Sequence, residues 1–166
     1  ITTLHPYLSY QNLLDGAEIG NIKDSFVMAR STLNSVLPKS TSVVYSLNKV
    51  FKGIKNKIHC MSFRVPTSIV SCGIMDLEIS NNKLTKKKII NMLKNYSKDK
   101  NYLINFVDKP LASIDYLKSN YATNIDTKWI DIINKNKIQL VYWYDNEWGY
   151  VHGINKLIHL LKKRFF

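Results

Sequence analysis

The spacing of apolar and polar residues predicts strands and helices over most of the chain. Runs rich in β-branched and aromatic residues, bounded by polar or turn-forming residues, predict strands. These runs cover residues 1–5, 57–65, 69–79, 102–107, 123–132 and 137–144. Apolar residues at helical spacing predict helices at residues 25–37, 42–51, 85–97 and 148–164. The helix at 85–97, which Thr85 can cap, has the clearest pattern. Its apolar face consists of Ile89, Ile90, Leu93 and Tyr96.

The remaining segments predict loops and turns. Residues 6–24 have no hydrophobic period and contain Gly16 and Gly20, so we expect a long irregular loop of the kind that carries function or forms an interface. Residues 134–136, Asn-Lys-Asn, predict a hairpin turn between the last two strands. Strands mostly follow strands, with a few helices between them. The pattern therefore predicts an α+β fold, with a mostly antiparallel mixed sheet and helices packed on one face.

The composition is typical of one globular domain. The chain has 166 residues, of which 45% are hydrophobic and 22% are charged, and this balance excludes wholesale disorder. Cys60 and Cys72 are too few for a disulfide scaffold, so a reducing, cytoplasmic location is expected. No apolar stretch is long enough to span a bilayer, and no secretory signal opens the chain, so no membrane partner is expected. Because the chain begins with Ile1 rather than Met, we expect it to be a piece of a longer protein.

The formal net charge of +12 first suggests nucleic-acid binding. However, only three of the 24 basic residues are arginines, and the joint excess of Lys, Asn and Ile is typical of an AT-rich coding genome. Phosphate recognition favours Arg. We therefore expect a solvated lysine-rich surface, and nucleic acid is not the expected partner. A basic, non-catalytic nucleic-acid-binding module remains an alternative. The lysines that it would use are Lys86, Lys87, Lys88, Lys162 and Lys163.

Short motifs with a mechanism of their own are absent from the sequence. It contains neither a G-x-G-x-x-G loop nor a P-loop pattern. The histidines are far apart and have no metal-ligand spacing, so no metal site is predicted. They are His5, His59, His152 and His159.

Four longer segments are more informative. They are ITTLHPY at 1–7, Ala29-Arg30 followed by LPKST at 37–41, FRVPT at 63–67, and WYDNEWGY at 143–150. In this order they resemble the C-terminal, catalytic half of glyceraldehyde-3-phosphate dehydrogenase, and the octapeptide is highly specific to that family. The resemblance covers essentially all 166 residues. It implies that the nucleotide-binding half, and the Ser-Cys-Thr-Thr-Asn segment with the nucleophilic cysteine, lie upstream of Ile1.

The resemblance implies a phosphorylating, NAD(P)-dependent oxidoreductase of glycolysis. In this family a cysteine thiolate attacks the aldehyde, hydride passes to the nicotinamide, and inorganic phosphate releases an acyl phosphate from the thioester. His5 matches the catalytic base, a role for which an imidazole with a pKa near neutrality is suited. Without its flanking motif, His5 would be taken as an ordinary structural residue. The fragment alone is expected to be inactive.

The resemblance also assigns binding residues. Arg30 matches the arginine on the inorganic-phosphate side, Arg64 matches the one on the substrate-phosphate side, and Thr41 matches the hydroxyl that binds inorganic phosphate. Asn146 would hold the nicotinamide carboxamide, and Tyr150 would lie beside that ring. The alternative interpretation is surface ion pairs for the arginines and core packing for the aromatic residues.

The same resemblance implies a domain organisation and an assembly. Residues 1–148 would form the catalytic domain, with an S-shaped interface loop at about 10–23. Helix 149–166 would pack on the NAD-binding domain, and the complete protein would be a homotetramer.

Three positions differ from the usual family pattern. Leu8 replaces a threonine that contacts the substrate phosphate, Tyr10 replaces an aspartate, and Ser42 replaces a glycine. These changes leave open a different phosphorylated aldehyde, such as erythrose 4-phosphate. Cys60 and Cys72 lie among apolar neighbours in predicted strands, and we interpret them as small hydrophobic residues rather than substitutes for the nucleophile.

Overall fold

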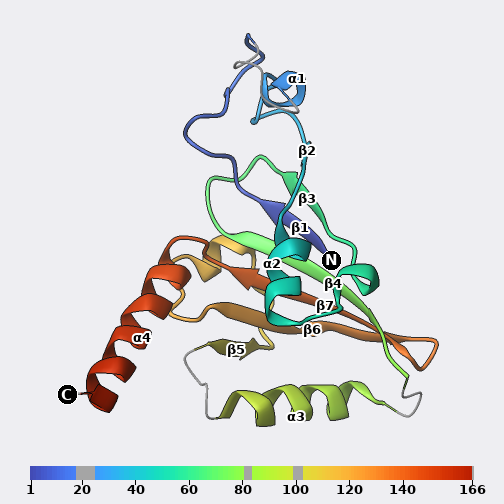
Figure 1. Ribbon diagram of the computed structural model, residues 1–166. Coiled ribbons are helices and arrows are strands. Elements are labelled where there is room, and N and C mark those ends of the chain that lie inside the picture. The colour runs from blue at the N-terminus through green and yellow to red at the C-terminus, as the bar shows by residue number, and fades with distance from the viewer. Residues whose placement is uncertain (18–24, 81–83, 99–102, 166) are drawn as a thin grey trace. The chain divides into compact units, whose positions relative to one another are not determined.

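The computed structural model describes residues 1–17, 25–80, 84–98 and 103–165. Two compact units make up the chain, residues Ile1–Ile69 and Val70–Phe166 (Figure 1). Each unit has its own strands and helices. Among the helices of the described residues, none combines the length and the hydropathy needed to cross a membrane.

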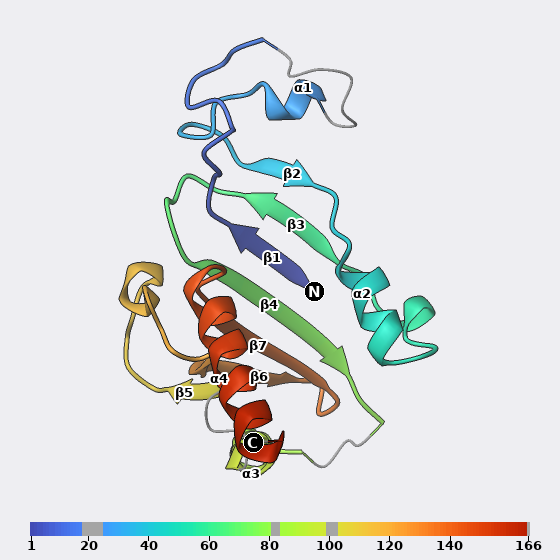
Figure 2. The same ribbon diagram turned by 60° about the vertical axis from the view of Figure 1, so that its left-hand side comes forward.

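The first unit is built on three strands in the order β2–β3–β1 (Figure 2). β1 (Thr2–His5) pairs in parallel with β3 (Met61–Arg64), and β2 (Leu37–Lys39) pairs antiparallel with β3. A parallel pair needs a long connection. Here the connection includes α2 (Val43–Val50) and the 3-10 helix η1 (Lys55–Lys57), which contact each other.

The helix predicted at 25–37 is wrong, because α1 (Ser25–Met28) forms only its first turn. The following residues bond to the loop that precedes the helix. Thr32 donates its N–H and its hydroxyl to the Asn12 carbonyl at 3.0 and 2.9 Å, and the Ser31 hydroxyl donates to the next carbonyl of that loop at 2.7 Å. Short polar side chains compete with helical hydrogen bonding in this way. The helical period of the sequence therefore does not form a long helix.

The second unit is built on four strands in the order β4–β7–β6–β5. Their bounds are β4 (Ser71–Glu78), β5 (Ile104–Val107), β6 (Thr123–Ile133) and β7 (Lys137–Tyr144). Its helices are α3 (Lys86–Ser97), the 3-10 helix η3 (Ser113–Tyr116) and α4 (Trp148–Phe165). β7 is antiparallel to both β4 and β6, whereas β5 and β6 are parallel. The α+β class and the mixed sheet are confirmed. The expectation that the sheet is mostly antiparallel is wrong, because β1–β3 and β5–β6 pair in parallel.

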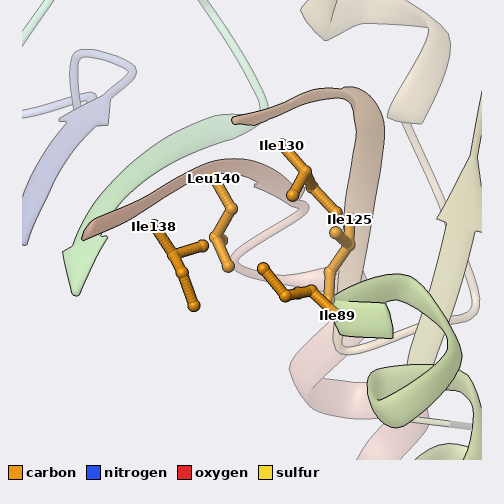
Figure 3. Close-up of a cluster of buried hydrophobic side chains, with 5 residues drawn as sticks. All are labelled: Ile89, Ile125, Ile130, Ile138 and Leu140. Atoms are coloured by element: carbon orange, nitrogen blue, oxygen red, sulfur yellow. The ribbon is translucent and has the colours of Figure 1, made fainter. Parts of the chain in front are cut away.

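The core of the second unit lies between α3 and the sheet. Five buried side chains form one cluster, with Ile89 of α3 packed against aliphatic residues of β6 and β7 (Figure 3). The strand residues are Ile125, Ile130, Ile138 and Leu140. As predicted, Thr85 caps α3, since its hydroxyl accepts from the Lys88 N–H at 3.3 Å.

The hairpin between β6 and β7 turns at the predicted place. The turn consists of residues 134–136, and Asn134 and Lys135 have φ of 50° and 66°, the left-handed backbone that tight hairpin turns use. Asn tolerates this region better than most residues. The predicted turn is confirmed.

Val70, the first residue of the second unit, also has a left-handed backbone. Its φ is 67°, although its side chain is β-branched and only 4% exposed. A β-branched residue in this region is strained and remains there only where surrounding structure requires it.

α4 carries an apolar stripe whose members are exposed within the described chain. The stripe contains Val151, Ile154, Leu157, Ile158 and Leu161. These are the residues that the helical period places together on one face. The predicted helix at 148–164 is confirmed, and its apolar face is available to pack against a further surface.

Candidate active site

His5 and Arg64 are brought together by the parallel pairing of β1 and β3. Each is the last residue of its strand, and the two are register partners. The Val65 N–H donates to the His5 carbonyl at 2.9 Å, which extends the ladder past the strand ends. Arg64 is oriented by a hydrogen bond from its Nη1 to the Pro6 carbonyl at 2.8 Å. Residues 59 positions apart in sequence therefore share one end of a sheet.

The His5 ring is held by a buried threonine two residues earlier on the same face of β1. Thr3 Oγ1 lies 3.1 Å from His5 Nε2, and the same hydroxyl donates to the Met61 carbonyl at 3.3 Å. Because the hydroxyl proton is directed at Met61, the lone pair of the oxygen faces the ring. With the hydroxyl donating to Met61, this contact favours the Nε2–H tautomer of neutral His5.

The surroundings of His5 favour its neutral form. Its pKa is lowered from 6.5 to about 4, first by burial and then by the positive charges of Arg64 and Lys39. An imidazole that is neutral at physiological pH can accept a proton, as a general base must. The electrostatics of the site are therefore compatible with the predicted role of His5.

Arg30 lies in a different environment from Arg64. It follows α1, and its Nη2 forms an ion pair with Asp15 Oδ2 at 3.2 Å. The two side chains are 51% and 58% exposed, so this is a solvent-screened surface pair. The Asp15 carboxylate also accepts from the Ser31 N–H at 2.8 Å, so Arg30 is linked to the loop before α1.

Thr41 lies between β2 and α2 and lines a cavity of about 390 Å³. Its hydroxyl accepts from the Val43 N–H at 3.3 Å, which fixes the turn that enters α2. The other residues that line the cavity are Val27, Pro38, Lys39, Ser40, Cys60, Met61, Ser62 and Phe63. None of them is acidic, so the cavity suits an anion or a neutral group better than a cation.

Asn146 and Tyr150 belong to the second unit, at the start of α4, and both are exposed. The buried Asp145 organises this segment. Its Oδ1 accepts from the N–H groups of Glu147 and Trp148 at 3.1 and 2.9 Å, and its Oδ2 accepts from Lys118 N–H at 3.0 Å. A carboxylate that caps a helix in this way also interacts favourably with the positive end of the helix dipole.

The aromatic residues of the same octapeptide have different environments. Trp143 stacks on Tyr116 with 5.5 Å between ring centroids, as the core-packing interpretation expects. Trp148 is 44% exposed and donates its Nε1–H to Asn120 Oδ1 at 2.9 Å. Core packing therefore applies to Trp143 and not to Trp148.

Sequence reasoning missed three residues that shape these sites, namely Thr3, Lys39 and Asp145. Thr3 could have been found from its i, i+2 spacing to His5 in a strand. Asp145 could have been found as an N-cap just before a helical pattern. Lys39 has no local signal, because its effect on His5 depends on the pairing of β2 with β3.

The cysteines differ in exposure and in surroundings. Cys72 is buried in β4, and its pKa is raised to about 11, first by burial and then by the nearby Asp126 carboxylate. Such a thiol is a poor nucleophile. Cys60 lies just before β3 rather than in it, and is half-buried beside the Thr41 cavity. Within the described ranges, no group of three or more His, Cys, Asp or Glu side chains could hold a metal ion.

Comparison with known proteins identifies the family to which the chain is similar. The pattern of the family described as "Glyceraldehyde 3-phosphate dehydrogenase, C-terminal domain" matches residues 1–146. A chloroplastic glyceraldehyde-3-phosphate dehydrogenase of Arabidopsis thaliana is 30% identical over 163 residues, which are 97% of this chain and 39% of that protein. Glyceraldehyde-3-phosphate dehydrogenase 2 of Staphylococcus epidermidis is 30% identical over 93% of this chain and 43% of its own length. The cytosolic enzyme of Chlamydomonas reinhardtii is 30% identical over 98% of this chain and 47% of its own length.

These matches define an oxidoreductase family and one of its domains. The chain belongs to the glyceraldehyde-3-phosphate dehydrogenase family and corresponds to the C-terminal domain. It spans 39–47% of the length of the three relatives named above.

Proposed function

We propose that this chain is the catalytic half of a phosphorylating, NAD(P)-dependent glyceraldehyde-3-phosphate dehydrogenase of glycolysis. The complete protein oxidises the aldehyde through a cysteine thioester and releases an acyl phosphate after attack by inorganic phosphate. His5 pairs with the thiolate and accepts the proton of the hemithioacetal. The nucleophile comes from outside these 166 residues, so the fragment alone is inactive.

The observation that carries this proposal is the pairing of His5 with Arg64 at the ends of β1 and β3. A base and a guanidinium group side by side provide proton transfer and charge neutralisation for a phosphorylated substrate. Arg64 binds the phosphate of the substrate, and Thr41 and Arg30 bind the inorganic phosphate.

NAD or NADP supplies the hydride acceptor when it is bound. The exposed Asn146 has an amide that can both donate to and accept from a carboxamide, and the exposed Tyr150 offers an aromatic face, so both residues fit a nicotinamide. In this proposal Asn146 holds the carboxamide and Tyr150 lies beside the ring. Most of the cofactor site belongs to the nucleotide-binding half.

The test is an assay of the complete protein for aldehyde- and phosphate-dependent reduction of NAD or NADP. His5→Asn should lower kcat roughly 10²- to 10⁴-fold, because it removes the general base. Arg64→Met should instead raise the KM for the phosphorylated aldehyde. A complete protein without this activity, or a His5→Asn variant with full activity, would contradict the proposal.

A second substrate is favoured by one observation, the apolar Leu8 that replaces the phosphate-contacting threonine. The Leu8 N–H donates to Gln11 Oε1 at 2.9 Å, and its side chain cannot form hydrogen bonds. The alternative substrate is erythrose 4-phosphate. Measuring kcat/KM for both aldehydes with the same preparation distinguishes the two activities.

We also propose that the complete protein is a cytoplasmic homotetramer. The named cytosolic relative and the two free cysteines support this location, although the Arabidopsis relative is chloroplastic. Residues 1–148 form the catalytic domain, and residues 149–166 pack on the nucleotide-binding half. Part of the expected interface loop, residues 18–23, lies outside the described residues.

A further inference from the structure

Lys39 shares one face of the first unit's sheet with His5 and Arg64. The strand register places Lys39 opposite Ser62, and Ser62 opposite Thr3. Residues directly opposite each other point to the same face, as do residues two apart along a strand. Arg64 and His5 therefore form the next row on the face that carries Lys39.

The charge of Lys39 acts on this face. It is one of the two cations that lower the pKa of His5, although β3 separates their strands. The sequence from 25 to 75 contains no Asp or Glu. Within the described residues, the ion pair recorded in this unit is that of Arg30 with Asp15, and no described carboxylate pairs with Lys39. The positive charge of Lys39 is thus not neutralised by an ion pair with a described residue.

The same lysine lines the cavity that contains Thr41. The cavity volume of about 390 Å³ lies within the range of small-molecule sites. Its polar side chains are the ammonium group of Lys39 and the hydroxyls of Ser40, Thr41 and Ser62. All of these groups can donate hydrogen bonds, and no lining residue has a carboxylate that would repel an anion. This combination suits a phosphate-type oxyanion.

We propose that Lys39 is an anion-binding residue that, together with Thr41, binds a phosphate oxyanion in the cavity that both residues line. This inference rests on the proposed function only in assuming that phosphate is a ligand of the protein. It adds a cation that the family resemblance does not assign. The two basic residues lie in different environments. Arg30 forms a surface ion pair with Asp15, whereas Lys39 lines the cavity beside Thr41.

The test measures phosphate binding by the complete protein without aldehyde or coenzyme, by calorimetry. The variants are Lys39→Met, Lys39→Arg and the matched control Lys52→Met, which removes an exposed lysine of the same unit outside the cavity. Lys39→Met should weaken inorganic phosphate binding by roughly ten- to a hundredfold, the effect of one charge-assisted contact. Lys39→Arg should keep most of the affinity, and Lys52→Met should bind as the parent does.

The source of the phosphate is distinguished by a second titration with glycerol 3-phosphate, an unreactive monoester. Weakening for inorganic phosphate alone assigns the site to the attacking phosphate, and weakening for the ester alone assigns it to the substrate phosphate. An equal effect of Lys39→Met and Lys52→Met, or no effect of Lys39→Met, would overturn the inference. A protein that binds phosphate through Lys39 but lacks dehydrogenase activity would contradict the proposed function and not this site.

Discussion

His5 combines three features at the scale of one residue. It is half-buried, it is paired with Arg64 across two strands, and its ring contacts the Thr3 hydroxyl. Burial and neighbouring positive charge both disfavour the imidazolium ion. Loss of either cation should therefore move the pKa of His5 back toward its ordinary value, which NMR titration of the ring protons would measure.

The depressed pKa of His5 makes the free energy of unfolding depend on pH. The unfolded chain binds a proton at His5 below pH 6.5, whereas the folded chain does so only below about pH 4. The contribution to stability is therefore complete above pH 6.5 and is lost as the pH falls toward 4. The free energy of unfolding, measured by urea denaturation at several pH values between 4 and 7, should depend less on pH in His5→Asn than in the parent protein. His159 is exposed, and His159→Asn serves as the control. An equal pH dependence of the unfolding free energy in the two variants would refute the expectation.

Replacing Thr3 by Val should release the His5 ring while keeping the shape of the side chain. In the complete protein we expect kcat to fall roughly tenfold with little change in KM, because one hydrogen bond to the base is lost. Nitrogen-15 shifts of His5 should show a smaller fraction of the Nε2–H tautomer, and Thr3→Ser should restore it. An unchanged tautomer in Thr3→Val would mean that Thr3 does not hold the ring.

Some residues of the site could be predicted from the sequence, and others could not. His5, Arg64 and Thr41 were named from motifs, and the structure places His5 beside Arg64. Lys39 could not be found in this way, since its relation to His5 exists only after β2 has paired with β3. Long-range strand pairing is not encoded in any local spacing.

At the scale of elements, hydrophobic periodicity correctly predicted the helices and strands whose apolar residues follow a regular helical or strand spacing. The helices α2, α3 and α4, the β6–β7 hairpin and its turn follow directly from apolar spacing and turn residues. The short strand β2 was missed, because residues 31 and 32 bond to the preceding loop and end the helical pattern early. Hydrogen bonds to the loop determine the structure of this segment, and such bonds cannot be predicted from the spacing of apolar residues.

Gly73 of β4 has a specific packing partner across the strand pair. It is opposite Tyr142 of β7, and a Cβ on Gly73 would collide with that ring. Gly73→Ala should lower the free energy of unfolding by about 1–3 kcal/mol, because the ring must move from its place. Chemical denaturation measures this change.

The control for this prediction is Gly153→Ala in α4, where a new Cβ would meet nothing within 4 Å. That change should be neutral or stabilising by up to about 1 kcal/mol, as alanine is the better helix former. Combining Gly73→Ala with Tyr142→Leu should recover part of the loss. If both alanine variants had the same stability, the ring contact would be unimportant.

At the scale of the whole molecule, the proposed site residues belong to both units. His5, Thr41 and Arg64 lie in residues Ile1–Ile69, whereas Asn146 and Tyr150 lie in residues Val70–Phe166. The proposed reaction therefore requires groups from both units and a nucleophile from outside the chain.

The apolar stripe of α4 provides a prediction at this scale. Changing both Leu157 and Ile158 to Asp should lower the Tm of the complete protein by roughly 5 °C or more, if the stripe is buried against the nucleotide-binding half. The same double change should have little effect on the 166-residue chain, where these side chains are already exposed. Changing Asn155 and His159 to Asp adds equal charge to the polar face of the helix. Equal melting temperatures for the two double variants would argue against this packing.

The left-handed backbone of Val70 has a kinetic consequence for the boundary between the units. An unfolded valine rarely visits this region, which costs roughly 1–2 kcal/mol relative to the right-handed one. The native dihedral angle can therefore persist only after the buried surroundings of its side chain have formed. Val70 should acquire its final conformation late in folding, so that weakening its packing accelerates unfolding more than it slows folding.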